Sequence, residues 1–276
     1  FEVKEQLTTT TNVSSANSQG VGSSFSTNTY TSAWYLTKIE SPFTGSVIDL
    51  NYSFVNFSNR QRIGSEEKYS GSINGFNRVD NYESGFVPKL ISIVTDIETI
   101  NFSTSTRTDF SGEVKLDKFE VIRNGSIFKK IEFNYDYFSA LSPNGEKRLR
   151  LTSIDQGGIS GASVPGWQFE YYSGNMPNIL SHAFDYWGYY NGVSNNNSSA
   201  TLAASVSNPS LSGDDRSPSS TNAKRGMLKK ITYPTGGYSE FEYEGNDYGT
   251  SNKATGGLRV SKTTAFDGMD QANNIV

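Results

Sequence analysis

The chain has 276 residues, of which 34% are hydrophobic and 13% are aromatic, and its formal net charge is −4 at pH 7. It contains no cysteine and one histidine, which excludes disulfides, cysteine nucleophiles and cysteine-ligated metals. No basic run stands out, which argues against a nucleic-acid partner. No apolar run is long enough to insert into a membrane as a spanning helix. The length fits one large all-β domain or two smaller ones.

The N-terminal part of the chain is polar. Residues 8–32 are rich in Thr, Ser, Asn and Gly and contain few apolar side chains. Such a composition is typical of loops and sheet edges. We therefore predict an edge or linker segment over residues 1–32, followed by a strand-rich region over residues 33–276.

A clear strand pattern begins after Trp34. Over residues 48–54, apolar side chains alternate with polar ones, and this period of two predicts a strand with one buried face. Pro42 and Gly45 lie between this strand and a shorter apolar arm at residues 36–39. The two arms therefore predict a β-hairpin.

The same unit recurs along the chain. Each copy has an apolar residue, a second one three positions later, a turn with Gly, Pro or Asn, and an exit strand rich in aromatic residues. Further copies begin at Leu90, Leu116, Leu151 and Leu228, and a partial one begins at Leu258. A single hairpin cannot bury its apolar face alone. The repetition therefore predicts an all-β fold of successive antiparallel β-hairpins that form an extended, curved sheet.

An insertion at residues 173–226 separates the units that begin at Leu151 and Leu228. After residue 192 it is rich in Asn and Ser and includes Pro209 and Pro218. We predict a loop-rich insertion there. Residues 193–224 offer little apolar area to offset the entropic cost of ordering, so we expect this stretch to be mobile or highly exposed.

The repeated unit Leu-x-x-Ile-x-x-Pro-x-Gly, with its exit strand Phe-Glu-Tyr, resembles the YD repeats of Rhs proteins. A set of further motifs follows the order seen upstream of the Rhs core in very large surface proteins of Bacteroidota. These motifs are WYLTKI (34–39), LDKF (116–119), DYWGYYNG (185–192), YPTGG (233–237) and GGLRV (256–260). The resemblance covers roughly residues 33–270.

This resemblance implies a secreted or cell-surface protein exported by the type IX secretion system. In the wider family, strips of β-hairpins spiral into a hollow shell that encloses or presents a toxic C-terminal effector. We therefore expect an architectural segment that forms or braces such a shell. Its expected partners are the remainder of a longer chain, of which we expect this to be an internal fragment, and secretion or cell-surface components. Secretion-system cargo with no activity in this segment is an alternative.

One short segment has an unusual composition. The motif at residues 185–192 places four aromatic residues in five positions around Gly188. Asp185, Trp187, Tyr189 and Tyr190 are candidates for contact with a ligand or partner, and stacking on a sugar ring would make the chain a carbohydrate-binding or adhesive module. The alternative, which we favour, is that the rings cover the end of a sheet. Buried rings would support architecture, whereas coplanar exposed rings would support a glycan.

No set of catalytic residues converges in the sequence. His182 is the only histidine, and its spacing from Asp185 does not suit a Ser-His-Asp triad. Ser65 and Lys68 match the Ser-x-x-Lys pattern of serine acyltransferases, but the helical context and partner motifs are missing. One histidine without cysteine also disfavours a transition-metal site. We therefore expect no catalytic residue, metal or cofactor, and keep an enzyme only as a rival hypothesis.

Overall fold

The computed structural model describes residues 3–17, 20–69, 75–141, 146–157, 163–179, 181–193, 215–249 and 253–269, and the statements below concern these residues. They form one 13-stranded sheet. The strands are β1 (Val3–Asn17), β2 (Gly20–Tyr35), β3 (Lys38–Glu40), β4 (Val47–Tyr69), β5 (Gly75–Val94), β6 (Glu98–Thr106), β7 (Val114–Arg123), β8 (Ser126–Phe138), β9 (Arg148–Gly157), β10 (Ser163–Tyr171), β11 (Leu228–Thr232), β12 (Tyr238–Tyr248) and β13 (Lys253–Phe266). The helix α1 (Ser220–Ala223) precedes β11.

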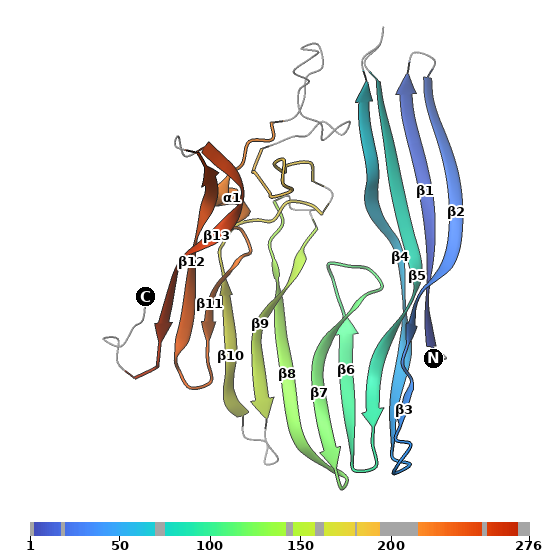
Figure 1. The fold of residues 1–276 in the computed structure, drawn as a ribbon, viewed down its shortest axis with the longest axis vertical. Helices are drawn as coiled ribbons and strands as arrows, with labels where there is room; N and C mark the ends of the chain where they lie inside the picture. The colour runs from blue at the N-terminus through green and yellow to red at the C-terminus, as the bar shows by residue number, and fades with distance from the viewer. Residues whose placement is uncertain are drawn as a thin grey trace.

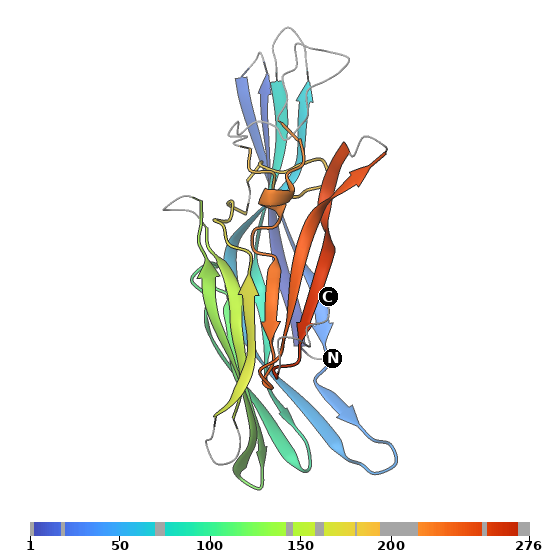
Figure 2. The same ribbon diagram turned by 90° about the vertical axis from the view of Figure 1, so that its left-hand side faces the viewer.

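Strands that are consecutive in sequence lie side by side from β5 to β13. Every pairing between named strands is antiparallel. Figures 1 and 2 show that the strands make a single curved sheet. In the described part of the chain, no pairing joins β13 to the strands at the other end, so the sheet is open. The predicted all-β fold of successive antiparallel hairpins is confirmed.

The turns follow the local sequence. Asn124 and Gly125 join β7 to β8 with φ values of 50° and 75°, as a tight hairpin turn with two positive φ angles requires. Between β11 and β12, Gly236 has a φ of 89°, and its N–H donates to the Tyr233 carbonyl at 2.9 Å. Both hairpins therefore form at the turns that the sequence predicts.

The hairpin of β1 and β2 pairs with β5, at the end of the consecutive strand order from β13 to β5. One edge of β5 pairs with β6 near Ser92 and with β1 from Phe86 to Phe76. The other edge pairs with β4 along most of its length. The polar tract at residues 8–32, expected as an edge or linker, thus lies mostly in the β1–β2 hairpin, with β2 at the sheet edge (Figure 1).

The register separates the sheet into two faces, because directly opposed residues of antiparallel strands share a face. Phe102 lies opposite Phe119, which lies opposite Ile131. The apolar face consists of Ile100, Phe102, Phe119, Val121, Ile131, Phe133, Ile154, Trp167, Phe169 and Ile231. The charged face consists of Lys118, Glu120, Lys130, Glu132, Asp155, Glu170, Lys230 and Glu240.

In the described part of the chain, no second layer covers the apolar face. Among the described residues, only Phe57, Ile131 and Ala183 are buried hydrophobic side chains. The other side chains of the apolar face are partly exposed. This face therefore remains in contact with water.

The described parts of the insertion lie at one end of the sheet. Residues 181–193 form a loop closed by a bridge between Phe184 and Tyr190, and residues 215–226 contain α1 (Figure 1). Most of the stretch that we expect to be mobile, residues 194–214, lies outside the described residues. No helix in the described ranges is long and apolar enough to cross a membrane.

Candidate functional site

The candidate site is the loop at residues 181–193, which we call the aromatic loop. It lies near the ends of β12 and β13, with residues 215–226 beside it (Figure 1). It contains all four residues that the sequence predicts as ligand or partner contacts.

Asp185 organises the turn of the aromatic loop. Its side chain is only 1% exposed. Its Oδ1 accepts hydrogen bonds from the backbone N–H groups of Trp187 at 2.9 Å and Tyr189 at 3.0 Å. The turn then passes through Gly188, whose φ of 88° favours glycine. The Asp185 carboxylate therefore holds the loop in shape and lies inside it.

A second segment anchors the loop from the side. Arg216 donates from Nη2 to the Asp185 carbonyl at 2.8 Å, and its guanidinium lies 4.7 Å from the Phe184 ring centre and 5.3 Å from that of Tyr186. Such cation–π contacts favour a fixed ring position. Asn222 donates from Nδ2 to the Asn191 carbonyl at 3.1 Å. The aromatic loop, which precedes residues 194–214, is therefore connected to residues that follow this stretch.

Two glycines of β13 provide the surface on which the rings lie. A β-carbon on Gly256 would come within 2.5 Å of the Trp187 side chain, and one on Gly257 within 3.2 Å of the Tyr189 ring. Asn246 of β12 donates to the Gly256 carbonyl at 3.2 Å. A glycine within a strand often marks such a close approach. The motifs DYWGYYNG and GGLRV, far apart in sequence, are thus parts of one packed unit.

The exposure of the rings matches neither of the two expected patterns. Tyr186, Trp187 and Tyr189 are 64%, 54% and 44% exposed. Tyr190 is half-buried, with the Arg225 guanidinium 5.2 Å from its ring centre. The rings of Tyr186 and Trp187 are 6.1 Å apart and inclined at 84°. The rings are neither buried nor, for this pair, coplanar, so they form an angular surface.

The site also contains residues that were not predicted from the sequence. Tyr186 is the most exposed ring of the loop, although only its neighbours were chosen as contacts. Gly256 and Gly257 support the rings, and the Gly-Gly pair within a strand pattern was a signal for them. Arg216 had no comparable signal, because its role depends on the position of residues 215–226 in space.

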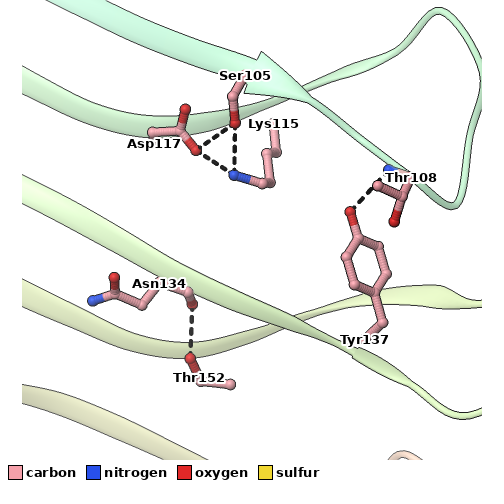
Figure 3. A network of polar contacts seen from close by, with 7 residues as sticks. All are labelled: Ser105, Thr108, Lys115, Asp117, Asn134, Tyr137 and Thr152. Carbon is pink, nitrogen blue, oxygen red and sulfur yellow. Dashed lines mark hydrogen bonds and ion pairs between the residues drawn. The ribbon is translucent and has the colours of Figure 1, made fainter.

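Figure 3 shows a polar cluster between β6 and β7 that contains a serine and a lysine, the two residues of a serine–lysine catalytic pair. Lys115 Nζ donates to Ser105 Oγ at 2.7 Å and to the Asp117 carboxylate, and the Ser105 hydroxyl donates to Asp117 at 2.9 Å. In a serine–lysine catalytic pair, the lysine must accept the serine proton. Here Lys115 is the donor and the serine proton points to Asp117. Ser105 and Lys115 lie opposite each other in the ladder, so the cluster joins two strands.

The loop between β6 and β7 is fastened to β8 and β9. The Tyr137 hydroxyl accepts the Thr108 N–H at 3.0 Å (Figure 3). Asp109 accepts two hydrogen bonds from Arg107, at 2.9 and 2.7 Å, and one from the Leu149 N–H at 2.9 Å. Burial raises the pKa of Asp109, but the bonds from Arg107 and Leu149 outweigh burial and leave this pKa below its usual value. These contacts hold the loop in place.

The remaining candidates for chemistry do not come together. His182 is buried in the aromatic loop, and the side chain of Ser65 is outside the described residues. Within the described ranges, no group of three or more His, Cys, Asp or Glu residues is placed to hold a metal ion.

No protein-family model matches the chain, and comparisons with curated proteins and with solved structures find no significant match. The resemblance to Rhs proteins therefore remains a prediction from the sequence motifs.

Proposed function

We propose that the chain is an architectural segment: a single-layer, curved β-sheet that forms part of the wall of a larger surface assembly and carries no catalytic site. The observation that supports this proposal is the apolar face. Its rings contact one another, with centres 6.1 Å apart for Phe102 and Phe119 and 6.3 Å apart for Phe119 and Phe133. All of its members except Ile131 remain partly exposed.

The energetics favour a covering partner. Burial of apolar surface contributes about 25 cal/mol per Å², so the uncovered rings would gain from contact with further protein. The opposite face is suited to water, because it carries charged pairs such as Lys118 with Glu120 at 3.0 Å and Lys130 with Glu132 at 3.0 Å. The proposed wall thus has its apolar face against protein and its charged face in water.

The sequence motifs support a particular setting for this wall. Their resemblance to the region upstream of the Rhs core favours a secreted or cell-surface protein, with the sheet forming or bracing a shell around an effector. In this setting the type IX secretion system would export the chain.

Site-specific photocross-linking in the protein from its native source would test the proposal. Phe119 and Glu120 are neighbours on β7 that point to opposite faces. A photoreactive residue at position 119 should form cross-links to protein, and the same residue at position 120 should not. Equal cross-linking from both positions, or none from position 119, would refute the architectural proposal.

A carbohydrate-binding or adhesive module is the second candidate, because three rings of the aromatic loop are exposed. A glycan array probed with the chain and with Trp187→Ala would test it. Binding that disappears in Trp187→Ala but persists in Tyr233→Ala, which removes an exposed ring elsewhere, would support an adhesive role. Absence of binding to any glycan would leave architecture as the better account.

A further inference from the structure

The outer edge of β2 is free. Among the described residues, β2 pairs with β1 and with no other strand. The register with β1 shifts once, between Glu5 and Gln6, so Gly20–Thr31 is a regular stretch of about 12 residues. An edge strand offers a row of unpaired N–H and C=O groups to any second strand that approaches.

From Gly20 to Thr31, this edge lacks the features that normally prevent strand pairing, since its one register shift, at Ser32, lies beyond this stretch. Proteins protect edges with charged residues, proline or bulges, yet β2 contains no Lys, Arg, Asp, Glu or Pro. The other free edges differ. The outer strand β13 carries Lys253, Arg259 and Lys262. The stretch of β4 beyond β3 carries Arg60, Arg62, Glu66, Glu67 and Lys68.

The side chains of β2 also suit a strand partner. Its described side chains from Ser24 to Tyr30 are all exposed, and Phe25 and Tyr30 are 68% and 42% exposed. The existing pairing with β1 shows how such a strand binds a similar one. The hydroxyls of Thr8 and Thr29 are 2.9 Å apart, and those of Thr10 and Thr27 are 3.3 Å apart. Threonine and aromatic residues are favoured in strands and in cross-strand pairs.

We propose that the β2 edge is a homodimer interface, at which the β2 strands of two copies pair antiparallel and continue the sheet from one copy into the other. A second copy fits because the edge is uncharged, so identical strands meet without like-charge repulsion. With a two-fold axis perpendicular to the sheet at Thr27, Phe25 of each copy lies opposite Thr29 of the other. An antiparallel ladder contributes about one hydrogen bond per residue pair. With the axis at Thr27, the regular stretches of the two copies overlap over residues 23–31 and would form about nine hydrogen bonds, close to the 10 of a typical interface.

The geometry predicts a closed dimer. Pairing of the same edge in both copies uses up that edge, so assembly stops at two chains. The charged residues of β13 oppose further addition at that edge. This interface is separate from the apolar face, so the proposal does not depend on the architectural function.

Sedimentation equilibrium of the full chain and of two matched variants would test the proposal. Thr27→Lys places a charge on the β2 edge, and Thr263→Lys places the same charge on an exposed Thr of β13. We expect the unmodified chain to be a dimer, and Thr27→Lys to weaken dimerisation at least about tenfold, since like charges directly opposite each other are destabilising. Thr263→Lys should leave the dimer intact.

A monomeric chain at its highest soluble concentration would overturn the proposal. So would a dimer that Phe119→Ser abolishes but Thr27→Lys does not, because association would then run through the apolar face. Circular dichroism would confirm that the variants fold.

Cysteine cross-linking provides a test that tolerates any folding defect of Thr27→Lys. The chain has no cysteine, so a single introduced thiol can only link two copies. Opposed positions near a two-fold axis come close enough for a disulfide. Thr27→Cys should give a covalent dimer on mild oxidation. Thr29→Cys should not, because in this register the two copies of residue 29 are four positions, or about 13 Å, apart, and Thr263→Cys should not either. Absence of a cross-link from Thr27→Cys would overturn the proposal.

Discussion

The side chain of Trp187 lies directly over Gly256, so closely that a β-carbon on Gly256 would come within 2.5 Å of it. This contact joins the aromatic loop to β13 across a long stretch of sequence. Because Trp187 is still 54% exposed, the contact fixes the indole against the sheet and leaves much of its surface in solvent. The orientation of the exposed rings therefore depends on a glycine in another part of the chain.

Substitution of this glycine should disturb the aromatic loop. Gly256→Ala would force the Trp187 side chain away from β13, and such overpacking costs about 1–3 kcal/mol. Denaturant unfolding would measure the loss, and hydrogen exchange should increase at residues 185–190. Gly157→Ala is the control, because the nearest side-chain atom to its new β-carbon is the flexible end of Lys130 at 3.1 Å. Equal losses in the two variants would show that the Trp187 contact has no special role.

The buried carboxylate of Asp185 should contribute to stability. Asp185→Ala leaves the N–H groups of Trp187 and Tyr189 without their acceptor. Because both hydrogen bonds are only partly buried, we expect a loss of about 1 kcal/mol, the low end of the range for an unsatisfied buried donor. Asp185→Asn retains an oxygen at the same position, so it should lose less of the free energy of unfolding. Thermal or urea unfolding of the two variants would compare them. If Asp185→Ala were as stable as the unmodified chain, the turn would not depend on these hydrogen bonds.

The two faces of the sheet should respond differently to truncation. Phe119→Ala removes a ring that touches Phe102 and Phe133. Because Phe119 is only half-buried, we expect a loss of about 2 kcal/mol, below the 3–5 kcal/mol of a fully buried Phe. On the charged face, Glu132→Ala should cost about 0.5 kcal/mol or less, because its ion pair with Lys130 is more exposed and such pairs contribute little. Urea melts of both variants would measure the difference, and equal costs would mean that both faces are covered.

Deprotonation of Tyr35 should lower the stability of the folded chain at alkaline pH. Burial, and then the hydrogen bond from its hydroxyl to Glu5 Oε2 at 2.8 Å, raise its pKa from 10.0 to about 12. The folded state therefore holds this proton more tightly than the unfolded state. The resulting stabilisation is fully present below pH 10 and is lost as the pH rises from 10 through about 12.

Unfolding at different pH values, together with ultraviolet titration of tyrosinate, would test this dependence. The difference between the unmodified chain and Tyr35→Phe isolates Tyr35 from the other tyrosines. Glu5→Gln keeps an acceptor but removes the charge, so it should lower the pKa of Tyr35. A Tyr35 that titrates near 10 in the folded chain would contradict the prediction.

Much of the fold follows from local sequence. Asn124 and Gly125 predict a hairpin turn because their backbone tolerates positive φ, and both adopt it. The alternation around Phe119 and Phe133 predicts which side chains share a face, since side chains in a strand alternate between two faces. These features depend on neighbours within a few residues, so the sequence by itself determines them.

The pairing of β1 with β5 could not be predicted from the local sequence. Residues 8–32 have no apolar alternation, because Thr and Ser occupy both faces and bond across strands through hydroxyls such as those of Thr8 and Thr29. The periodicity of hydrophobic residues therefore cannot predict such strands or their pairing. Pairing between residues distant in sequence decides which strand β1 joins. It also leaves β2 as an open edge.

The candidate site shows the same division. The sequence identifies a cluster of aromatic residues beside Asp185, and the structure keeps Tyr186, Trp187 and Tyr189 at the surface. Only the tertiary structure shows that the Asp185 carboxylate is turned inward to the N–H groups of Trp187 and Tyr189. A carboxylate can bind a ligand or close a turn, and which of the two it does depends on the hydrogen-bond donors that surround it in space. The bonds of Asp185 reach only two and four residues along the chain, whereas the position of the loop on β13, where Gly256 makes room for the indole, comes from the tertiary structure.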